Sequence, residues 1–259
     1  MMKNLPLQIS VAIIAKNEQE NLKRLLQNIT GFAEEIILVH NDCNDDTVRI
    51  AKDHGAQCFD EIWHGYKEQK NLAIQRCTKE WILCMDADEV LSDRLKQSIV
   101  SFLTNNSSRN YNGACFNRCS FFMGKWIRHG DWYPDRKNRL LRRSRGIWEG
   151  GQVHEHLAIE GKIYHLKGDL LHYSYNSILD LPKKMSVYAR QFARQRIKND
   201  KNVSSLQIWV RPLWRFVRAY FLRLGFLDGL PGLIIAFSSS YECMLKYVYQ
   251  RELVISQND

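Results

Sequence analysis

The chain has 259 residues and a mass of 30.5 kDa, with 45% apolar and 25% charged residues. This balance supports a sizeable core and excludes a wholly disordered chain, and 14 Gly with 5 Pro exclude a collagen-like one. Residues 1–100 hold 12 basic and 16 acidic side chains, whereas the remainder holds 25 basic and 12 acidic, so the net charge of +9 arises in the second part. That part is either a solvated basic face or a surface that meets an anionic partner.

The seven cysteines do not form the pattern of a secreted disulfide framework. Their number is odd, the chain is long, and no two of them are spaced as CxxC. The N-terminal sequence MMKNLPLQIS has no apolar stretch typical of a signal peptide, and no run of 18 uninterrupted apolar residues occurs. We therefore expect reduced thiols and a cytoplasmic location.

The first hundred residues alternate predicted strands and helices. Apolar runs predict buried strands at 9–15, 36–39, 57–59 and 81–85. Helical spacing predicts helices between them, with these expected capping residues: Asn17 with Glu20 as its capping-box partner, Asp45 or Asp46, and Ser92. This alternation is typical of βαβ units and a mainly parallel sheet.

Three polar clusters follow predicted strands: residues 16–18, 40–45 and 86–89. Right-handed crossovers place the carboxyl ends of parallel strands at one edge of the sheet, where ligands bind. We therefore expect these clusters to converge. Further on, residues 114–122, 139–142 and 163–173 predict strands, and the chain from about Ile178 onward is predicted to be helical.

The sequence Asp86-Ala87-Asp88-Glu89 comes directly after a buried strand. Two carboxylates at alternate positions beyond a strand end can share a divalent cation, and hard oxygen ligands suit Mg²⁺ or Mn²⁺. The alternative is that this sequence only caps the next helix. Similarly, Asn17 in the first cluster either faces a nucleotide or is only a helix cap, and the cluster at 40–47 either caps a helix or binds a base and ribose.

Four blocks in order resemble glycosyltransferase family 2, the nucleotide-diphospho-sugar transferases with the GT-A fold. They are SVAIIAKNE at 10–18, EIILVHNDCNDDT at 35–47, GYKEQKNLA at 65–73 and WILCMDADE at 81–89. The resemblance implies a Rossmann-like mixed, mainly parallel sheet flanked by helices, with a C-terminal helical extension. In these terms, residues 1–105 form the nucleotide-sugar-binding half, 106–176 the acceptor-side part with the catalytic base, and 177–259 the basic helical extension.

Later segments resemble a bacterial subgroup, the lipopolysaccharide core glucosyltransferases. They are Tyr133-Pro-Asp-Arg, Arg139-Leu-Leu-Arg-Arg, Val153-His-Glu and the stretch 212–232. This resemblance implies an inverting, metal-dependent transfer of a hexose, with UDP-glucose the expected donor, to the inner core of lipopolysaccharide or lipooligosaccharide. Where the family usually has Asp at the end of the second strand, this chain has His40, whose neutral imidazole can still bond to a base.

The resemblance also implies roles for single residues. Asp88 is the expected metal ligand, with Asp86 on metal or ribose. Glu155 is the expected catalytic base, with Asp131 and Asp135 as rivals. The spacing His154-Glu-His156 does not predict a zinc site. The expected donor-binding residues are Ala15, Asn17, Glu18, His40, Asp42, Lys70, Asn71, Asp86 and Arg139. Arg142 and Arg143 are further candidates for phosphate contacts.

Residues 206–224 mix aromatic side chains with Arg211, Arg215, Arg218 and Arg223. Such helices lie either in the interface of an anionic bilayer or packed on the catalytic domain, and we expect the cytoplasmic face of the inner membrane as a partner. Two alternatives remain open: transfer to a polyprenyl phosphate or capsule oligosaccharide, and a non-enzymatic basic protein that binds membrane or nucleic acid. The acidic first hundred residues argue against nucleic acid.

Overall fold

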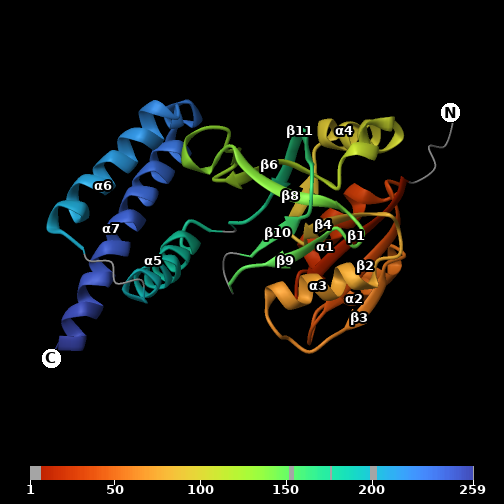
Figure 1. Cartoon of the computed structure of the whole chain (residues 1–259), viewed down its shortest axis with the longest axis horizontal. Helices are drawn as coiled ribbons and strands as arrows, with labels where there is room; N and C mark the ends of the chain where they lie inside the picture. Colours follow the sequence, from red (N-terminus) through yellow and green to blue (C-terminus); the bar gives the residue numbers. More distant parts are fainter. Residues whose placement is uncertain (1–6, 152–154, 176, 199–202, 259) are drawn as a thin grey trace. The chain divides into compact units, whose positions relative to one another are not determined.

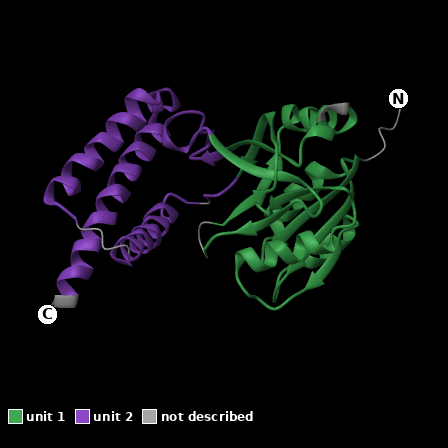
Figure 2. Cartoon of the chain, viewed as in Figure 1, with its two compact units in different colours: residues 1–118, 135–172 green, residues 119–134, 173–259 purple. Residues whose placement is uncertain are grey.

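The computed structural model describes residues 7–151, 155–175, 177–198 and 203–258 (Figure 1). The chain separates into two compact units, which Figure 2 colours differently. Unit 1 comprises residues 1–118 and 135–172, and unit 2 comprises residues 119–134 and 173–259. The expected acceptor-side part, residues 106–176, therefore contributes to both units.

The first half of unit 1 follows the predicted alternation. Its elements are β1 (Leu7–Ala15), α1 (Gln19–Ile29), β2 (Ala33–His40), α2 (Thr47–Asp53), β3 (Gln57–Asp60), α3 (Tyr66–Arg76) and β4 (Trp81–Asp86). Strands β1, β2, β3 and β4 pair in parallel in the order β3-β2-β1-β4, and Ala15 at the end of β1 is in register with His40 at the end of β2. The predicted α/β fold with a mainly parallel sheet is confirmed in this half.

The second half of unit 1 extends the same sheet with antiparallel pairs. Its elements are β5 (Glu89–Leu91), α4 (Asp93–Thr104), η1 (Asn106–Asn110), β6 (Gly113–Phe122), β8 (Asp135–Arg142), β9 (Gly146–Glu149), β10 (His156–Ile159) and β11 (Ile163–His172). Strand β6 continues past residue 118 into unit 2. The full strand order is β3-β2-β1-β4-β8-β6-β11-β5, and β9 and β10 form a separate two-stranded hairpin. The short strands β5, β9 and β10 were not predicted.

Alternate side chains of the central strands enter two cores. On one face, Ile9, Val11 and Ile13 of β1 pack with the leucines of α1 and with residues of α4. On the other face, Ala12 packs with Ala73 of α3 and with Trp148 of β9. Because both faces are covered, the strands are apolar throughout, and the polar residues gather at the strand ends.

The start of α4 and strand β11 approach each other closely. Ser92 caps α4 as predicted, because its side chain accepts a hydrogen bond from the Leu95 amide, and it also accepts one from the Asp169 amide. Gly168 has φ +102°, and a Cβ atom there would lie 2.4 Å from the Leu95 nitrogen. This glycine therefore permits the contact that positions the end of β11.

The prediction that Asn17 caps α1 is wrong. Glu18 occupies the N-cap position without a side-chain cap bond, and Asn17 adopts φ +54°. Its side-chain Oδ1 accepts a hydrogen bond from the Asn44 amide at 2.9 Å. Asn17 thus joins the loops after β1 and β2, which is a tertiary role that local spacing does not reveal.

Unit 2 is helical apart from its first segment, as predicted for the chain from Ile178 onward. It contains β7 (Lys125–Trp126), η2 (Gly130–Trp132), α5 (Asp180–Lys198), α6 (Ser205–Val217), the π-helical turn η3 (Arg218–Leu222), η4 (Gly225–Asp228) and α7 (Leu230–Asn258). Its core includes Phe122, Ile127, Leu181, Met185 and Ile235. Among the helices of the described ranges, none combines the length and apolarity needed to cross a bilayer.

Candidate active site

A cavity of about 560 Å³ lies at the carboxyl ends of β1, β2 and β4. Residues of all three predicted polar clusters line it, because the parallel strands end at one edge. The lining also includes residues of the loop before α3, of α3 and of the segments around Glu155 and His172. Its volume falls in the range of sites for small ligands and cofactors.

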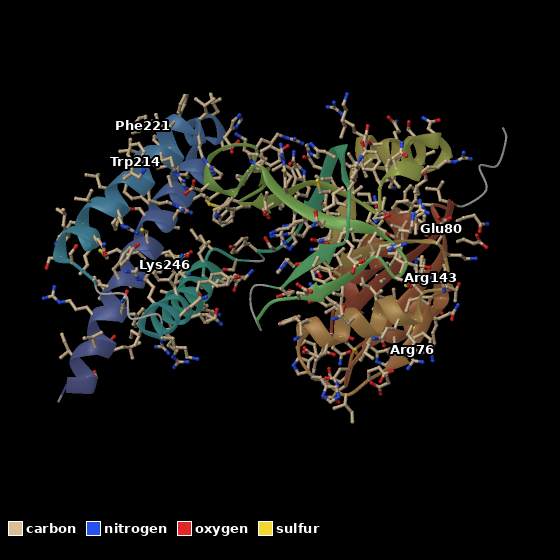
Figure 3. All side chains as sticks on the ribbon, in the orientation of Figure 1. Arg76, Glu80, Arg143, Trp214, Phe221 and Lys246 are labelled. Atoms are coloured by element: carbon tan, nitrogen blue, oxygen red, sulfur yellow. The ribbon has the colours of Figure 1, made fainter. Side chains whose placement is uncertain are left out.

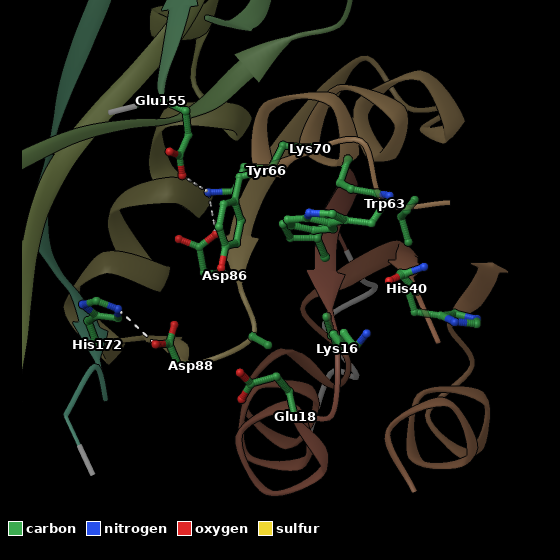
Figure 4. A pocket seen from close by; sticks show the side chains of 16 residues that line it. Lys16, Glu18, His40, Trp63, Tyr66, Lys70, Asp86, Asp88, Glu155 and His172 are labelled. Carbon is green, nitrogen blue, oxygen red and sulfur yellow. Dashed lines mark hydrogen bonds and ion pairs between the residues drawn. The ribbon is translucent and has the colours of Figure 1, made fainter. Parts of the chain in front are cut away.

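Lys70 of α3 stands between two carboxylates at the wall of this cavity. Its Nζ lies 2.9 Å from Asp86 Oδ1 and 3.1 Å from Glu155 Oε1 (Figure 4), and it also sits 4.4 Å from the ring centroid of Trp148. Burial lowers the pKa of this ammonium group, but the adjacent Asp86 and Glu155 outweigh that effect and raise it. Lys70 is therefore a fixed positive charge that holds two acidic residues together.

Asp86 is bound by two cations, since Arg139 Nη2 lies 2.6 Å from its second oxygen. Burial raises the pKa of Asp86, yet Arg139 and Lys70 hold it well below the usual range. Arg139 is itself buried and also lies 2.8 Å from Glu89, whose pKa is raised by burial. Both oxygens of Asp86 are engaged within the chain, which favours Asp88 over Asp86 as the ligand of a cation.

Asp88 lies opposite His172, the last residue of β11. The Nε2 atom of His172 is 3.2 Å from Asp88 Oδ2 (Figure 4). The pairing of β11 with β5 places His172 in register with Glu89, one residue beyond Asp88. Glu18 also lines the cavity, and burial raises the pKa of its carboxyl group. The negative charge of Asp88 raises this pKa further. Among the described residues no three His, Cys, Asp or Glu side chains form a ready metal cage.

The donor set at Asp88 fits a cation that also binds phosphate. One carboxylate and one imidazole are ligands that Mn²⁺ accepts, and Mg²⁺ sites in proteins commonly use one or two side chains with phosphate oxygens and water as the others. His172 Nδ1 has no hydrogen-bond partner among the described residues. Nε2 can bind a cation when the imidazole is neutral and its proton is on Nδ1.

Two exposed aromatic rings form another wall. Trp63 and Tyr66 meet edge to face, with ring centroids 4.9 Å apart. Gln69 holds the loop that carries Trp63, because its Nε2 donates to the Ile62 carbonyl at 2.6 Å. His40 lies near them, with its Nδ1 3.5 Å from Asp60 Oδ1. This wall offers an aromatic surface and a ring nitrogen to a flat, polar ligand group such as a nucleobase.

Of the predicted donor-binding residues, Ala15, Glu18, His40, Lys70 and Asp86 line the cavity. The other predicted donor residues, Asn17, Asp42, Asn71 and Arg139, are not among the residues that line it, and each has a partner within the chain. Asn71 both donates to and accepts from the backbone of Trp148, and exposed Asp42 pairs with Lys16. Arg142 pairs with Glu80, and the backbone amide of Arg143 donates to the Glu80 carbonyl.

The three candidate bases occupy different places. Glu155 lines the cavity, whereas Val153 and His154 of its motif lie outside the described residues. Asp135 pairs with Arg118 at 2.9 Å and with Lys137. Asp131 belongs to unit 2, where arginines surround its buried carboxylate. Only Glu155 of the three is among the described residues that line the cavity.

Sequence reasoning missed His172, Trp63 and Tyr66. His172 is the next-to-last residue of the predicted strand 163–173, and a polar residue near the end of a strand was a usable signal. Only the pairing of β5 with β11 brings it to Asp88. Trp63 lies in the loop between β3 and α3, and a solitary tryptophan there was the available signal.

A parallel sheet that carries acidic, basic and aromatic side chains around a cavity at its carboxyl edge defines a site for a phosphorylated, nucleotide-like ligand. Residues 10–164, more than half of the chain, match Glycosyl transferase family 2. The chain belongs to this family and is a glycosyltransferase, which decides against the non-enzymatic alternative.

Individual relatives agree with this assignment. The chain is 30% identical to an uncharacterized glycosyltransferase of Rickettsia prowazekii, over 96% of this chain and 89% of that one. It is 26% identical to the lipopolysaccharide core biosynthesis glycosyltransferase LpsC of Rhizobium meliloti, over 97% of this chain and 94% of that one. The crystal structure of S. aureus TarS 1-349 with UDP-GlcNAc has the same fold, with a TM-score of 0.52 at 10% identity over 96% of this chain and 92% of that one.

Proposed function

We propose that this glycosyltransferase moves a hexose, glucose in the first instance, from a uridine-diphosphate sugar to the inner core of lipopolysaccharide. The end-to-end similarity to LpsC supports the acceptor, and the presence of UDP-GlcNAc in the TarS structure makes uridine diphosphate the first nucleotide to test. The observation that carries the proposal is the placement of Asp88 with His172 and of Lys70 with Glu155 around one cavity.

We assign one part of the donor to each wall of the cavity. The base lies against Trp63 and Tyr66 with His40 near its edge, and the sugar lies toward Lys70 and Glu155. Asp88 and His172 are the residues that would hold Mg²⁺ or Mn²⁺, and Asp86 would serve as an acceptor for donor hydroxyls. When bound, the ion neutralises the negative charge that gathers on the departing diphosphate.

Glu155 is the proposed base. The acceptor hydroxyl oxygen forms a bond to the anomeric carbon while the bond from that carbon to the diphosphate oxygen breaks, which inverts the configuration. The hydroxyl proton passes to the Glu155 carboxylate, and the nucleoside diphosphate leaves with the bonding electron pair. Lys70, 3.1 Å from Glu155, positions that carboxylate at the wall of the cavity.

The experiment combines a deletion strain with a matched pair of variants. Cells that lack the protein should make an inner core shorter by one hexose, as measured by mass spectrometry of the lipooligosaccharide. Wild type and Asp135→Asn should restore that hexose, whereas Glu155→Gln should not, since loss of a general base costs about two to four orders of magnitude in rate.

Two outcomes would contradict the proposal. An unchanged core in the deletion strain would reject the lipopolysaccharide acceptor and direct attention to polyprenyl phosphate or capsule acceptors. Full restoration by Glu155→Gln, together with failure of Asp135→Asn, would assign the base to Asp135 instead.

A further inference from the structure

Helix α6 presents its apolar side chains to solvent. Leu206 is 70% exposed, Trp209 72% and Leu213 65%, and Trp214 is also more than half exposed. These positions follow helical spacing, so they form one stripe along α6. The buried positions of the same helix are Ile208 and Pro212. In an ordinary amphipathic helix of a globular protein the apolar stripe faces the core, and here it faces outward.

The exposed apolar residues continue past the end of α6. Phe221 and Leu222 of η3 are 53% and 62% exposed, and Phe226 and Leu227 of η4 are exposed as well. Figure 3 labels Trp214 and Phe221. We define the outer apolar surface of unit 2 by Leu206, Trp209, Leu213, Trp214, Phe221 and Leu222. A run of large apolar side chains of this extent marks an interaction site, because monomeric soluble proteins rarely expose one.

Three arginines from the same helical segment gather on one buried carboxylate. The side chain of Asp131 is only 1% exposed and forms ion pairs with Arg215 Nε, with Arg218 Nη2 at 2.9 Å and with Arg223 Nη1 at 3.4 Å. One carboxylate neutralises one guanidinium, so the group keeps an excess of two positive charges. Each of the three arginine side chains is between one third and one half exposed.

This arrangement holds positive charge in place next to an apolar surface. Asp131 fixes guanidinium groups that would otherwise sample many rotamers, and their exposed atoms remain available to phosphate oxygens, for which the planar fork is suited. The whole of unit 2 carries 15 Lys and Arg against 7 Asp and Glu, so it accounts for +8 of the net charge of +9. A partner should therefore be both anionic and apolar.

We propose that the outer apolar surface and the arginine group on Asp131 dock unit 2 onto the surface of an anionic phospholipid bilayer. The tryptophans and leucines enter the boundary between headgroups and acyl chains, and Arg215, Arg218 and Arg223 bind lipid phosphates. Helices with aromatic and aliphatic residues beside basic ones lie in this interface, and each basic residue near an anionic surface adds to the attraction. The inference does not depend on the acceptor proposed above.

A second copy of the chain is a poorer occupant of this surface. In a two-fold symmetric dimer the same patch faces itself, so the arginine groups of the two copies would approach each other. Two like-charged groups with an excess of two positive charges each would repel across the interface. A bilayer that contains anionic lipid instead matches the charge and covers the apolar side chains together.

The test is flotation of the full chain with vesicles of pure phosphatidylcholine and with vesicles of equal parts phosphatidylcholine and phosphatidylglycerol. Wild type should bind the anionic vesicles at least tenfold better than the neutral ones. Trp209→Ser combined with Trp214→Ser should weaken binding to the anionic vesicles tenfold or more. Arg223→Gln should weaken it about fivefold, which is equivalent to about 1 kcal/mol.

Matched controls separate the surface from general effects. Val187→Ser removes an exposed apolar side chain of α5, and Lys183→Gln removes one exposed positive charge of α5; both should bind within twofold of wild type. Circular dichroism melting curves establish that each variant is folded. We chose Arg223 because its ion pair with Asp131 is the longest of the three, and Arg215 and Arg218 still neutralise the carboxylate after the exchange.

Three outcomes would overturn the proposal: no binding of wild type to anionic vesicles, binding of the folded double tryptophan variant as tight as wild type, or losses with Val187→Ser and Lys183→Gln equal to those of the surface variants. Sedimentation velocity identifies the occupant in the first case. A concentration-dependent dimer that the double tryptophan variant abolishes would assign the surface to a second copy of the chain.

Discussion

The Nε2 atom of His172 lies 3.2 Å from Oδ2 of Asp88, although strands β5 to β10 and helix α4 separate the two residues in the sequence. The antiparallel pairing of β5 with β11 creates this relationship, because it sets His172 beside Glu89. The acidic loop after β4 thereby gains a neighbouring imidazole nitrogen that its local sequence does not contain. The candidate cation site is thus a product of the antiparallel half of the sheet as much as of the parallel half.

Removing the carboxylate of Asp88 should abolish metal-dependent turnover. We expect Asp88→Asn to lower the rate of UDP-glucose hydrolysis in Mn²⁺ by about a hundredfold or more, because charge on the leaving diphosphate is no longer neutralised. EDTA should have the same effect on wild type. Calorimetric titration with Mn²⁺ and UDP checks the binding directly, and Asp53→Asn on α2 is the matched control. Unaltered hydrolysis in Asp88→Asn would remove Asp88 from the site.

The buried ammonium of Lys70 should contribute strongly to stability. In Lys70→Met, Glu155 loses its ion pair with the ammonium group and Asp86 keeps only Arg139, so we expect the free energy of unfolding to fall by about 3 kcal/mol or more. Lys67→Met, one turn earlier and only partly buried, should change it by less than about 0.5 kcal/mol. Urea denaturation followed by circular dichroism measures both values. Equal, small losses in the two variants would show that the Lys70 pairs add no net stability.

Trp63 should contribute to donor affinity. Trp63→Ala removes an aromatic ring from the cavity wall, and we expect UDP to bind about tenfold more weakly, which corresponds to the ~1–3 kcal/mol of one base stacked on an aromatic ring. Ile62→Ala is the matched control, because Ile62 is adjacent and 75% exposed. Isothermal titration calorimetry at saturating Mn²⁺ gives both dissociation constants. If the two variants bind UDP equally well, the nucleobase does not lie on Trp63.

Glu35 should make stability depend on acid pH. Burial raises the pKa of its carboxyl, but hydrogen bonds from Ser10 and from the amide and hydroxyl of Thr78 leave it below its ordinary value of 4.5. The carboxylate therefore contributes stability above pH 4.5, and this stability is lost as the pH falls through the lowered pKa.

Unfolding free energies measured by urea titration between about pH 6 and pH 3 test this assignment. Glu35→Gln should show a shallower decline on acidification than wild type. Thr78→Val removes the hydroxyl that donates to Glu35, so it should lower the free energy of unfolding by about 1 kcal/mol near neutral pH. The decline of this free energy on acidification should lie between those of wild type and Glu35→Gln. A decline in Glu35→Gln as steep as in wild type would place the acid-sensitive group elsewhere.

Sequence alone determined the parallel half of unit 1 and the edge at which its ligand site lies. The buried runs of β1, β2 and β4 and the helical spacing between them are local patterns, and parallel strands joined by helices leave only one edge for the polar residues that follow them. Glu18, His40 and Asp88 could therefore be placed at one site before any coordinates.

Only the tertiary structure decided how the charges at that edge are paired. Asp86 and Arg139 neutralise each other, His172 reaches Asp88, and Asn17 ties two loops together instead of capping α1. The outward apolar face of α6 also has no local signature, because helical spacing defines a stripe but not the side on which neighbours pack. These features depend on contacts between residues distant in sequence, and periodicity carries information only about neighbours along the chain.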